Sequence, residues 1–396
     1  MFPILKLTGD PHARGVQYGT QAADQIRHSV AGYARLFAYR HGRDWNAVQT
    51  AALTYVPLLE AYTPDLLTEI RGIAEGAGRS LSEIVALNAR TELLAGSRRV
   101  GAHPDYLSAM ARNQVVGVPQ HADTPDLTPG DTTMFDMPPP DQGECTTVAA
   151  LPAATANGTT LLAQTWDWTG DQRAACVLLH ITAPDHPTIL TLTEAGIIAK
   201  IGLNDAGVGI CLNILSSNAD GTTPGLPIHV LLRYLLQLLD SNAVRAAVAR
   251  VPLAASSCIS VADADGQAVS LEVTPNGVGE LEPQEGLLAH TNHCLAETTC
   301  AGERALDPAS SSVPRFDRAN ELLTRQRGAL DPAALMELLR DREGAPNCIC
   351  RRPDMQLHPS ERPESVAGIV LDLPGRVMHV APGVPCDVEF EAVEVG

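Results

Sequence analysis

The chain has 396 residues, of which 45% are hydrophobic and 19% are charged, a balance that excludes a disordered or fibrous protein. Its formal net charge of -18 disfavours binding to nucleic acid or to an anionic membrane surface. No apolar run reaches the roughly 18 residues that a membrane-spanning helix needs, and the N-terminus lacks the pattern of a signal peptide. Nine cysteines, an odd number, argue against a secreted disulfide framework. We therefore expect a soluble, cytoplasmic protein.

The N-terminal quarter of the chain has helical periodicity. Apolar residues at helical spacing predict a helix that begins at Asp10 and extends through Leu36. A second helix is predicted over 45–62, and a third begins after Thr63. A capping box at Ser80 predicts the start of a fourth helix.

Residues 96–144 lose this periodicity and are rich in proline, which predicts an exposed linker. The linker ends at Glu144, and an apolar run of strand character begins just after Cys145. This change in composition and hydrophobic periodicity divides the chain into a helical N-terminal part, 1–144, and a strand-rich part, 145–396. We expect the two parts to form one domain.

The second part alternates short apolar runs with turn residues. Strands are predicted over 159–165, 176–182, 188–193, 197–203, 208–215, 257–262, 268–273, 287–291, 368–373, 377–381 and 388–391. Helices are predicted over 226–239, 243–251 and 331–340. Strands, two helices and strands again predict an α+β fold of antiparallel sheets covered by helices, not a series of βαβ units.

Cys145 is the strongest candidate nucleophile. Hydroxyl-bearing Thr146 and Thr147 follow it, and the linker before it leaves the peptide bond to Glu144 accessible to the thiol. If that bond breaks, Cys145 becomes an N-terminal residue whose α-amino group, with a pKa of about 7.7–8.0, is a base beside the nucleophile. The alternative interpretation is a cysteine that merely begins a strand.

Two charged residues could assist such a nucleophile. Asp167 lies between Trp166 and Trp168, where it is either a turn residue or a carboxylate that orients an ammonium group or an arginine. Arg351 follows two alternating cysteines and is either a surface cation or a bidentate partner for a carboxylate.

The segment 290–294, His-Thr-Asn-His-Cys, is dense in polar donors and admits three interpretations. It is a polar turn, or a metal site with Cys300, Cys348 and Cys350, or the source of an amide donor, Asn292, for an oxyanion. The metal interpretation lacks the paired Cys-x-x-Cys motifs of zinc sites.

Taken in order, these segments resemble the isopenicillin N acyltransferase family of self-processing N-terminal-nucleophile (Ntn) hydrolases. The resemblance is carried by Gly9, Gly15 and Gly19 and by residues 70–76, 87–92, 145–147, 166–167, 193–198, 202–208, 254–256, 290–294 and 349–351. It implies a four-layer αββα sandwich, made as one precursor and cut before the cysteine into α and β subunits that stay together as a heterodimer.

The resemblance also implies roles for individual residues. It makes Cys145 the processing and catalytic nucleophile, Thr147 the hydroxyl that assists processing, Asn292 the oxyanion-hole donor, Asp167 and Arg351 the pair that orients the new amino terminus, and Ser256 a pocket serine. We also expect His293 to contact the substrate. The cleavage site departs from the pattern of the fungal enzymes, because Glu144 replaces a glycine and predicts slower cleavage.

The expected activity is hydrolysis of a small acyl amide through a thioester on Cys145, with no cofactor and no metal. Acyl transfer from an amide or a CoA thioester to an amine is the close alternative. A second alternative is a cysteine hydrolase that is not cleaved and uses His290 or His293 as its base. A third is a thiol- or zinc-binding protein built on the cysteines between 294 and 350.

Overall fold

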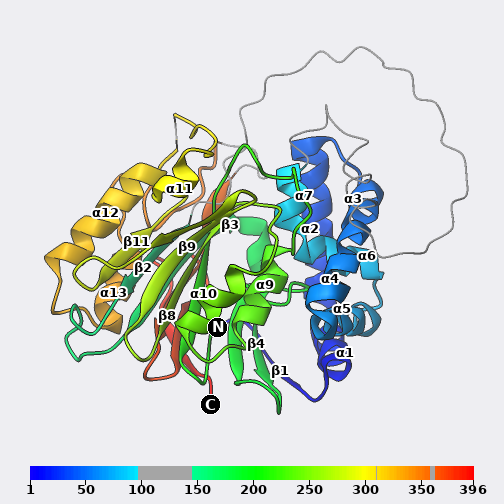
Figure 1. Cartoon of the computed structure of the whole chain (residues 1–396), viewed down its shortest axis with the longest axis horizontal. Helices are drawn as coiled ribbons and strands as arrows, with labels where there is room; N and C mark the ends of the chain where they lie inside the picture. The colour runs from blue at the N-terminus through cyan, green and yellow to red at the C-terminus, as the bar shows by residue number, and fades with distance from the viewer. Residues whose placement is uncertain (97–144, 309, 357–361) are drawn as a thin grey trace, which may run out of the picture.

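A computed structural model describes residues 1–96, 145–308, 310–356 and 362–396. Two β-sheets face each other, and helices cover the outer face of each, so the molecule has the expected four layers (Figure 1). The predicted linker lies outside the described residues except for its first one, and Glu144 lies outside them too. No helix in the described ranges combines the length and apolar character needed to cross a membrane.

The N-terminal part begins with a strand and continues as helices. Its elements are β1 (Ile4–Thr8), α1 (Pro11–Gln21), α2 (Ala23–His41), α3 (Trp45–Ala52), α4 (Val56–Tyr62), α5 (Pro64–Gly76), α6 (Leu81–Asn88) and α7 (Arg90–Gly96). The helix predicted from Asp10 to Leu36 is two helices that break at Ala22, so that α1 packs on α5 while α2 packs on β5. The capping box at Ser80 is confirmed, because its hydroxyl accepts from the Glu83 N–H.

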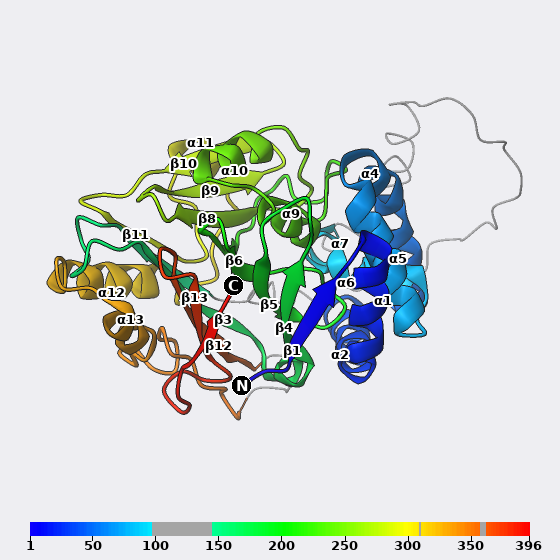
Figure 2. The ribbon, with the colours of Figure 1, turned by 90° about the horizontal axis from the view of Figure 1, so that it is seen from below.

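The larger sheet has eight strands in the order β1-β4-β5-β6-β7-β8-β9-β10. Those after β1 are β4 (Cys176–Thr182), β5 (Ile189–Glu194), β6 (Ile201–Asn204), β7 (Val208–Ile214), β8 (Ser257–Asp263), β9 (Ala268–Thr274) and β10 (Gly277–Leu281). Neighbours are antiparallel except β1 and β4, which run parallel (Figure 2). This departure from the antiparallel expectation is possible because β1 is far from β4 in the sequence and needs no tight turn to reach it.

The smaller sheet has six strands in the order β11-β2-β3-β12-β13-β14. They are β11 (Leu287–His290), β2 (Thr146–Ala150), β3 (Leu161–Thr169), β12 (Pro363–Asp372), β13 (Val377–Ala381) and β14 (Glu391–Glu394). The strand predicted over 388–391 is wrong in its limits, since β14 begins only at Glu391. The N-terminus lies against β14, where the Met1 amino group pairs with the Glu391 carboxylate at 2.7 Å. Figure 2 shows the N-terminus on the same side of the molecule as the smaller sheet's last strands.

Five helices accompany these sheets in the second part of the chain as described. They are α9 (Ile228–Leu235), α10 (Ser241–Val248), α11 (Glu297–Cys300), α12 (Ser312–Arg325) and α13 (Pro332–Leu339). Helices α12 and α13 cover the outer face of the smaller sheet, and α10 packs on β8 and β9 of the larger one (Figure 1). Helix α12 was not among the helices predicted from the sequence.

The alternation of side chains along β2 places the candidate nucleophile between the sheets. Cys145 and Ala149 belong to the main core, which includes the residues between the two sheets. Val148 and Ala150 point the other way and pack with the residues of α12 and α13. Successive strand residues face opposite sides of a sheet, so this pattern fixes which layer each side chain enters.

Candidate active site

The Cys145 side chain is buried at the start of β2, with 3% of its surface exposed. Its sulfur accepts the backbone N–H of Asp167 on the neighbouring strand β3. Burial, followed by the negative charge of Asp167, raises the pKa of Cys145 to about 12, although Lys200 and Arg315 oppose the increase. In the uncut chain this thiol is therefore protonated at neutral pH.

The backbone of Cys145 is held as firmly as its side chain. Its N–H donates to Oδ1 of Asn292 at 2.7 Å. Its carbonyl oxygen accepts from Nδ2 of Asn213 at 2.9 Å and from Nη1 of Arg315 at 2.8 Å. Asn213 on β7, Arg315 on α12 and Asn292 in the turn after β11 thus fix the two peptide groups on either side of the Cys145 α-carbon.

Asn292 is itself tightly positioned. Its Nδ2 donates to the carbonyl of Ile214 at 3.0 Å, and its Oδ1 also accepts from Nη2 of Arg315 at 3.1 Å. Its backbone N–H donates to the Ser312 hydroxyl at 2.8 Å. In this state its amide group orients the nitrogen of Cys145, and its expected role as an oxyanion donor stays a prediction.

Thr147 reaches Cys145 through one intermediate. Its hydroxyl donates to Oδ1 of Asn213 at 2.7 Å, and the same amide group donates to the Cys145 carbonyl. Asn213 lies on β7 of the larger sheet, so this buried chain of hydrogen bonds links the two sheets. A full set of partners on a buried amide makes its orientation unique.

Asp167 and Arg351 are both buried and are brought together by Ser365 on β12. The Ser365 hydroxyl donates to Oδ1 of Asp167 at 2.7 Å and accepts the backbone N–H of Arg351 at 3.0 Å. The Arg351 guanidinium donates to Oδ1 of Asn347 at 2.7 Å and to the Ser311 hydroxyl at 3.4 Å. The two charged residues named from the sequence are therefore linked through Ser365, and Asp167 lies next to Cys145.

Ser256 lies one step further away. Its N–H and hydroxyl donate to Oδ1 of Asp220 at 2.9 and 2.6 Å. Its carbonyl accepts the N–H of Leu215, which follows the Ile214 whose carbonyl holds Asn292. The structure thus connects Ser256 to the site through the end of β7.

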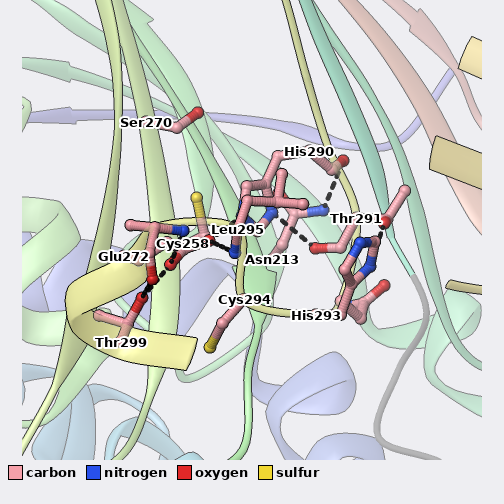
Figure 3. A network of polar contacts seen from close by, with 12 residues as sticks. Asn213, Cys258, Ser270, Glu272, His290, Thr291, His293, Cys294, Leu295 and Thr299 are labelled. Atoms are coloured by element: carbon pink, nitrogen blue, oxygen red, sulfur yellow. Dashed lines mark hydrogen bonds and ion pairs between the residues drawn. The ribbon is translucent and has the colours of Figure 1, made fainter. Parts of the chain in front are cut away.

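His290 is held between two acceptors (Figure 3). Its Nε2 lies 2.8 Å from the Glu272 carboxylate, and its Nδ1 donates to the carbonyl of Thr291 at 2.8 Å. Burial favours the neutral ring, but the Cys258 sulfur and Glu272 outweigh it and raise the pKa of His290 to about 10. A doubly protonated imidazole has no lone pair to accept a proton, so His290 is not a general base here.

His293 differs from His290 because its pKa is lowered and not raised. Burial and then the positive charges of His290 and Arg315 lower its pKa to about 4, so the ring is neutral at neutral pH. Its Nδ1 lies 2.8 Å from the Ser312 hydroxyl and 3.2 Å from that of Thr291, and its ring stands edge-on to Phe316. These contacts place it on the α12 side of the site.

Arg315 and Asn213 are the residues that the sequence analysis missed. Arg315 is 1% exposed, and it also donates from Nε to the Ser311 hydroxyl at 3.0 Å and from Nη1 to that of Thr146 at 2.9 Å. The spacing of Arg315, Ala319 and Leu322 was an available signal, because apolar residues at helical intervals predict the buried face of a helix. Nothing in the sequence marks Asn213 among other strand residues.

A buried cluster of charges lies near the thiol. The Lys200 ammonium pairs with Glu194 at 2.5 Å and lies 3.7 Å from the centre of the Trp166 ring. Burial and the nearby charge of Arg90 lower the pKa of Lys200 to about 8. Glu194 accepts from both cations and is fully buried, so the cluster joins the first part of the chain to the second.

A pocket of about 340 Å³ reaches the site from the α12 side, and Ser311, Arg315 and Asn347 are among the residues that line it.

The cysteines proposed as zinc ligands do not form a metal site: within the ranges that the structure covers, no three His, Cys, Asp or Glu side chains are grouped to hold a metal ion.

Two solved structures show a distantly similar chain arrangement. A mutant of conjugated bile acid hydrolase from Clostridium perfringens is 11% identical, with a TM-score of 0.42 over 63% of this chain and 92% of that one. Penicillin V acylase from Agrobacterium tumefaciens is 16% identical, with a TM-score of 0.42 over 60% of this chain and 82% of that one.

Sequence comparison is more decisive. The family model for acyl-coenzyme A:6-aminopenicillanic acid acyl-transferase matches residues 154–358. The acyl-coenzyme A:6-aminopenicillanic-acid-acyltransferase 40 kDa form of Emericella nidulans is 30% identical over 380 residues, which are 95% of this chain and 91% of that protein. The resemblance found in the sequence is confirmed, and the chain belongs to the acyl-coenzyme A:6-aminopenicillanic acid acyl-transferase family.

Proposed function

We propose that the protein is a self-processing amidohydrolase in which Cys145 is the nucleophile for its own cleavage and for catalysis. The observation that carries the proposal is the fixation of the Cys145 backbone by Asn292, Asn213 and Arg315. A cysteine that merely begins a strand needs no such set of side chains. A residue whose own peptide bond is attacked does need it, because the reaction requires a fixed geometry.

In the cleavage step, the Cys145 sulfur attacks the carbonyl carbon of Glu144. The carbon–nitrogen bond breaks, the nitrogen takes up a proton, and the acyl group of residue 144 becomes a thioester on the sulfur. Water then hydrolyses the thioester and leaves a free carboxylate on one fragment and a free amino group on Cys145. The hydrogen-bonded chain from Thr147 through Asn213 supports this step by holding the Cys145 carbonyl in place.

In turnover, the free amino group of Cys145 accepts the thiol proton, and the thiolate attacks the carbonyl of a small acyl amide. We assign Asn292 to the developing oxyanion, because its side-chain amide, whose Oδ1 accepts the Cys145 N–H in the uncut chain, lies next to the nucleophile and carries the N–H donor that acyl transfer needs. Asp167 and Arg351, joined by Ser365, orient the new amino terminus. The leaving amine takes the proton, and water releases the acid.

The mature enzyme is then an α subunit, residues 1–144, bound to a β subunit, residues 145–396, with no nucleic-acid or membrane partner. Ser256 and His293 are assigned to substrate contact, although neither is among the residues that line the pocket of about 340 Å³. Location in the cytoplasm stays a prediction from the odd number of cysteines.

Acyl transfer to an amine is the second candidate, and the family relative named above supports it, because its name describes a transferase that uses an acyl-CoA and 6-aminopenicillanic acid. The two outcomes differ only in whether water or an amine attacks the thioester. Incubation with an acyl-CoA and 6-aminopenicillanic acid distinguishes them: an acylated amine identifies a transferase, and free acid alone identifies a hydrolase.

The deciding experiment is intact-mass analysis and N-terminal sequencing of the purified wild-type chain and of Cys145→Ala. We expect two fragments from the wild type, one of them beginning with Cys145, and a single uncut chain from the variant. Cys300→Ala, at an exposed cysteine, is the matched control and should be cleaved like the wild type. An active wild type without a fragment that begins at Cys145 would overturn the proposal. Loss of activity in an uncut His293→Ala variant would then favour the Cys–His alternative.

A further inference from the structure

Three cysteines that the proposed mechanism does not use lie together at Cys348, Cys350 and Cys386. The backbone N–H of Cys386 donates to the Cys350 sulfur at 3.1 Å. The Cys348 thiol donates instead to the carbonyl of Cys350 at 3.0 Å. The Cys350 sulfur thus lies against Cys386, whereas the Cys348 sulfur lies against the backbone of Cys350.

Contacts between residues adjacent to Cys350 and Cys386 hold the two chain segments side by side. Arg352, two residues after Cys350, forms an ion pair with Asp387, the residue after Cys386. A disulfide requires Cβ atoms about 3.5–4.5 Å apart, and contacts that hold two segments side by side limit the movement needed to reach this separation.

The two thiols differ in their access to solvent. Cys350 is fully buried, and burial raises its pKa well above the ordinary value. Cys386 is partly exposed. An oxidant from solvent therefore meets Cys386 first, and the buried Cys350 is placed to react with the product.

We propose that Cys350 and Cys386 form a redox modification site that hydrogen peroxide converts into an intramolecular disulfide. The thiolate of Cys386 attacks one peroxide oxygen, the O–O bond breaks, and sulfenic acid and hydroxide form. Cys350 then loses its proton and attacks the Cys386 sulfur, and the S–O bond breaks as the S–S bond forms. The sum is two thiols and one peroxide giving one disulfide and two water molecules.

The bond would act on the candidate site through Arg351, which follows Cys350 directly. The backbone N–H of Arg351 donates to the Ser365 hydroxyl, which in turn donates to Asp167. A crosslink at Cys350 restricts this backbone without touching Cys145. The proposal does not depend on self-processing, because both cysteines lie in the same part of the chain.

The test treats the purified, folded Cys145→Ala chain with hydrogen peroxide, so that oxidation of the nucleophile does not interfere. Free thiols are then alkylated, and peptides are mapped with and without reduction. We expect a peptide pair joined through Cys350 and Cys386, a loss of two hydrogen atoms in the intact mass, and full reversal by dithiothreitol. Cys386→Ser should abolish the crosslink and leave Cys350 alkylated, whereas Cys300→Ser should leave the crosslink unchanged.

Alkylation of both Cys350 and Cys386 after peroxide treatment would overturn the proposal. A crosslink from Cys348 to either cysteine, or oxidation of Cys386 to a sulfinic acid without a crosslink, would overturn it equally. If Cys386→Ser fails to fold, the peptide map of the chain that retains Cys386 decides the question alone. Loss of the crosslink in Cys300→Ser would show that a different pair is involved.

Discussion

At the scale of single residues, the protonation state of the Cys145 thiol governs the first reaction. Its pKa is raised to about 12 by burial and then by the charge of Asp167, so the thiolate is scarce at neutral pH. Each pH unit below the pKa reduces the thiolate fraction about tenfold. We therefore expect self-processing that depends on this thiolate to be slow at pH 7. This effect adds to the slower cleavage expected from Glu144 at the cleavage site.

We therefore predict that cleavage of freshly made chain accelerates between pH 7 and pH 9, by up to about tenfold per pH unit. The uncut fraction can be followed by gel electrophoresis after cell-free synthesis and transfer to each pH. Cys145→Ala should remain uncut throughout. A cleavage rate that does not change over this range would show that the thiol loses its proton by another route.

Arg315→Met should slow both self-processing and turnover by roughly 100-fold, because it removes charged donors from the Cys145 carbonyl and from Asn292 at once. Arg315→Lys should recover part of the rate, since one ammonium group can satisfy one of the two acceptors. Rates of fragment formation and of amide hydrolysis, measured separately, check both steps. Arg325→Met, at an exposed position on the same helix, is the control.

His290→Gln should lower stability at pH 7 by about 3 kcal/mol, because it leaves the buried Glu272 carboxylate without its charged partner. The folded pKa of His290, about 10, lies above its unfolded value, so its stabilising effect is complete below pH ~6.5 and is lost as pH rises through 10. The difference in urea midpoint between wild type and variant should therefore shrink from pH 7 to pH 10. His12→Gln, at an exposed histidine, should show no such trend.

The sequence was informative for residues that carry a chemical signature. Cys145, Asp167, Asn292 and Arg351 can be named from the sequence as candidates, and their roles stay predictions. Asn213 and Arg315 cannot be, because a buried amide or guanidinium acquires its role only when distant elements meet around it.

At the scale of elements, a pair of helices is packed unusually closely. Gly15 and Gly19 of α1 face Gly72 and Gly76 of α5, and a Cβ atom built on Gly15 would overlap the carbonyl oxygen of Glu69. A Cβ on Gly72 would lie 2.5 Å from the carbonyl oxygen of His12. The atoms that a Cβ on Gly15 or Gly72 would overlap all belong to the backbone of the facing helix. Because a helix backbone cannot move aside locally, the two helices would have to separate.

Gly72→Ala should accordingly destabilise the protein by about 3 kcal/mol, despite the higher helix propensity of alanine. Gly302→Ala is the control, because a Cβ there would meet nothing closer than 3.8 Å and its backbone is not left-handed. Thermal unfolding of both variants checks the prediction. Equal melting temperatures would mean that α1 and α5 can move apart without cost.

Most helices and strands could be anticipated from periodicity and caps, but their limits could not. The break at Ala22 arises from packing of α1 on α5 and of α2 on β5, which local propensity does not encode. The strand β1 was missed because it is short, with only Leu5 and Leu7 buried among its five residues, and it is completed only by pairing with β4. Tertiary contacts override propensity in each case.

At the scale of the whole molecule, the two parts of the chain share one core. Asn88 donates to the carbonyl of Gly196 at 2.8 Å and accepts the N–H of Ile198 at 3.0 Å. Arg90 pairs with Glu194 in the buried cluster, and β1 supplies an edge strand to the larger sheet. These contacts predict that cleavage before Cys145 leaves the molecule assembled.

We therefore expect the two fragments to elute together in gel filtration, even in 1 M salt, because their joining contacts are buried and weakly screened. Denaturing electrophoresis of the same fraction should show two bands. Addition of 6 M urea before gel filtration should separate them. Fragments that elute apart under native conditions would mean that the linker, not the shared core, holds the parts together.

The burial of Lys200 has a practical consequence. Lys6 and Lys200 are the two lysines of the chain, so a folded, uncut molecule presents few primary amines to reagents in solution. Acetylating agents should reach Met1 and Lys6 first, while Lys200 is shielded by Glu194 and Trp166. Cleavage inside the chain would add one new amino group to this small number of reactive amines. Amine labelling could therefore follow maturation over time.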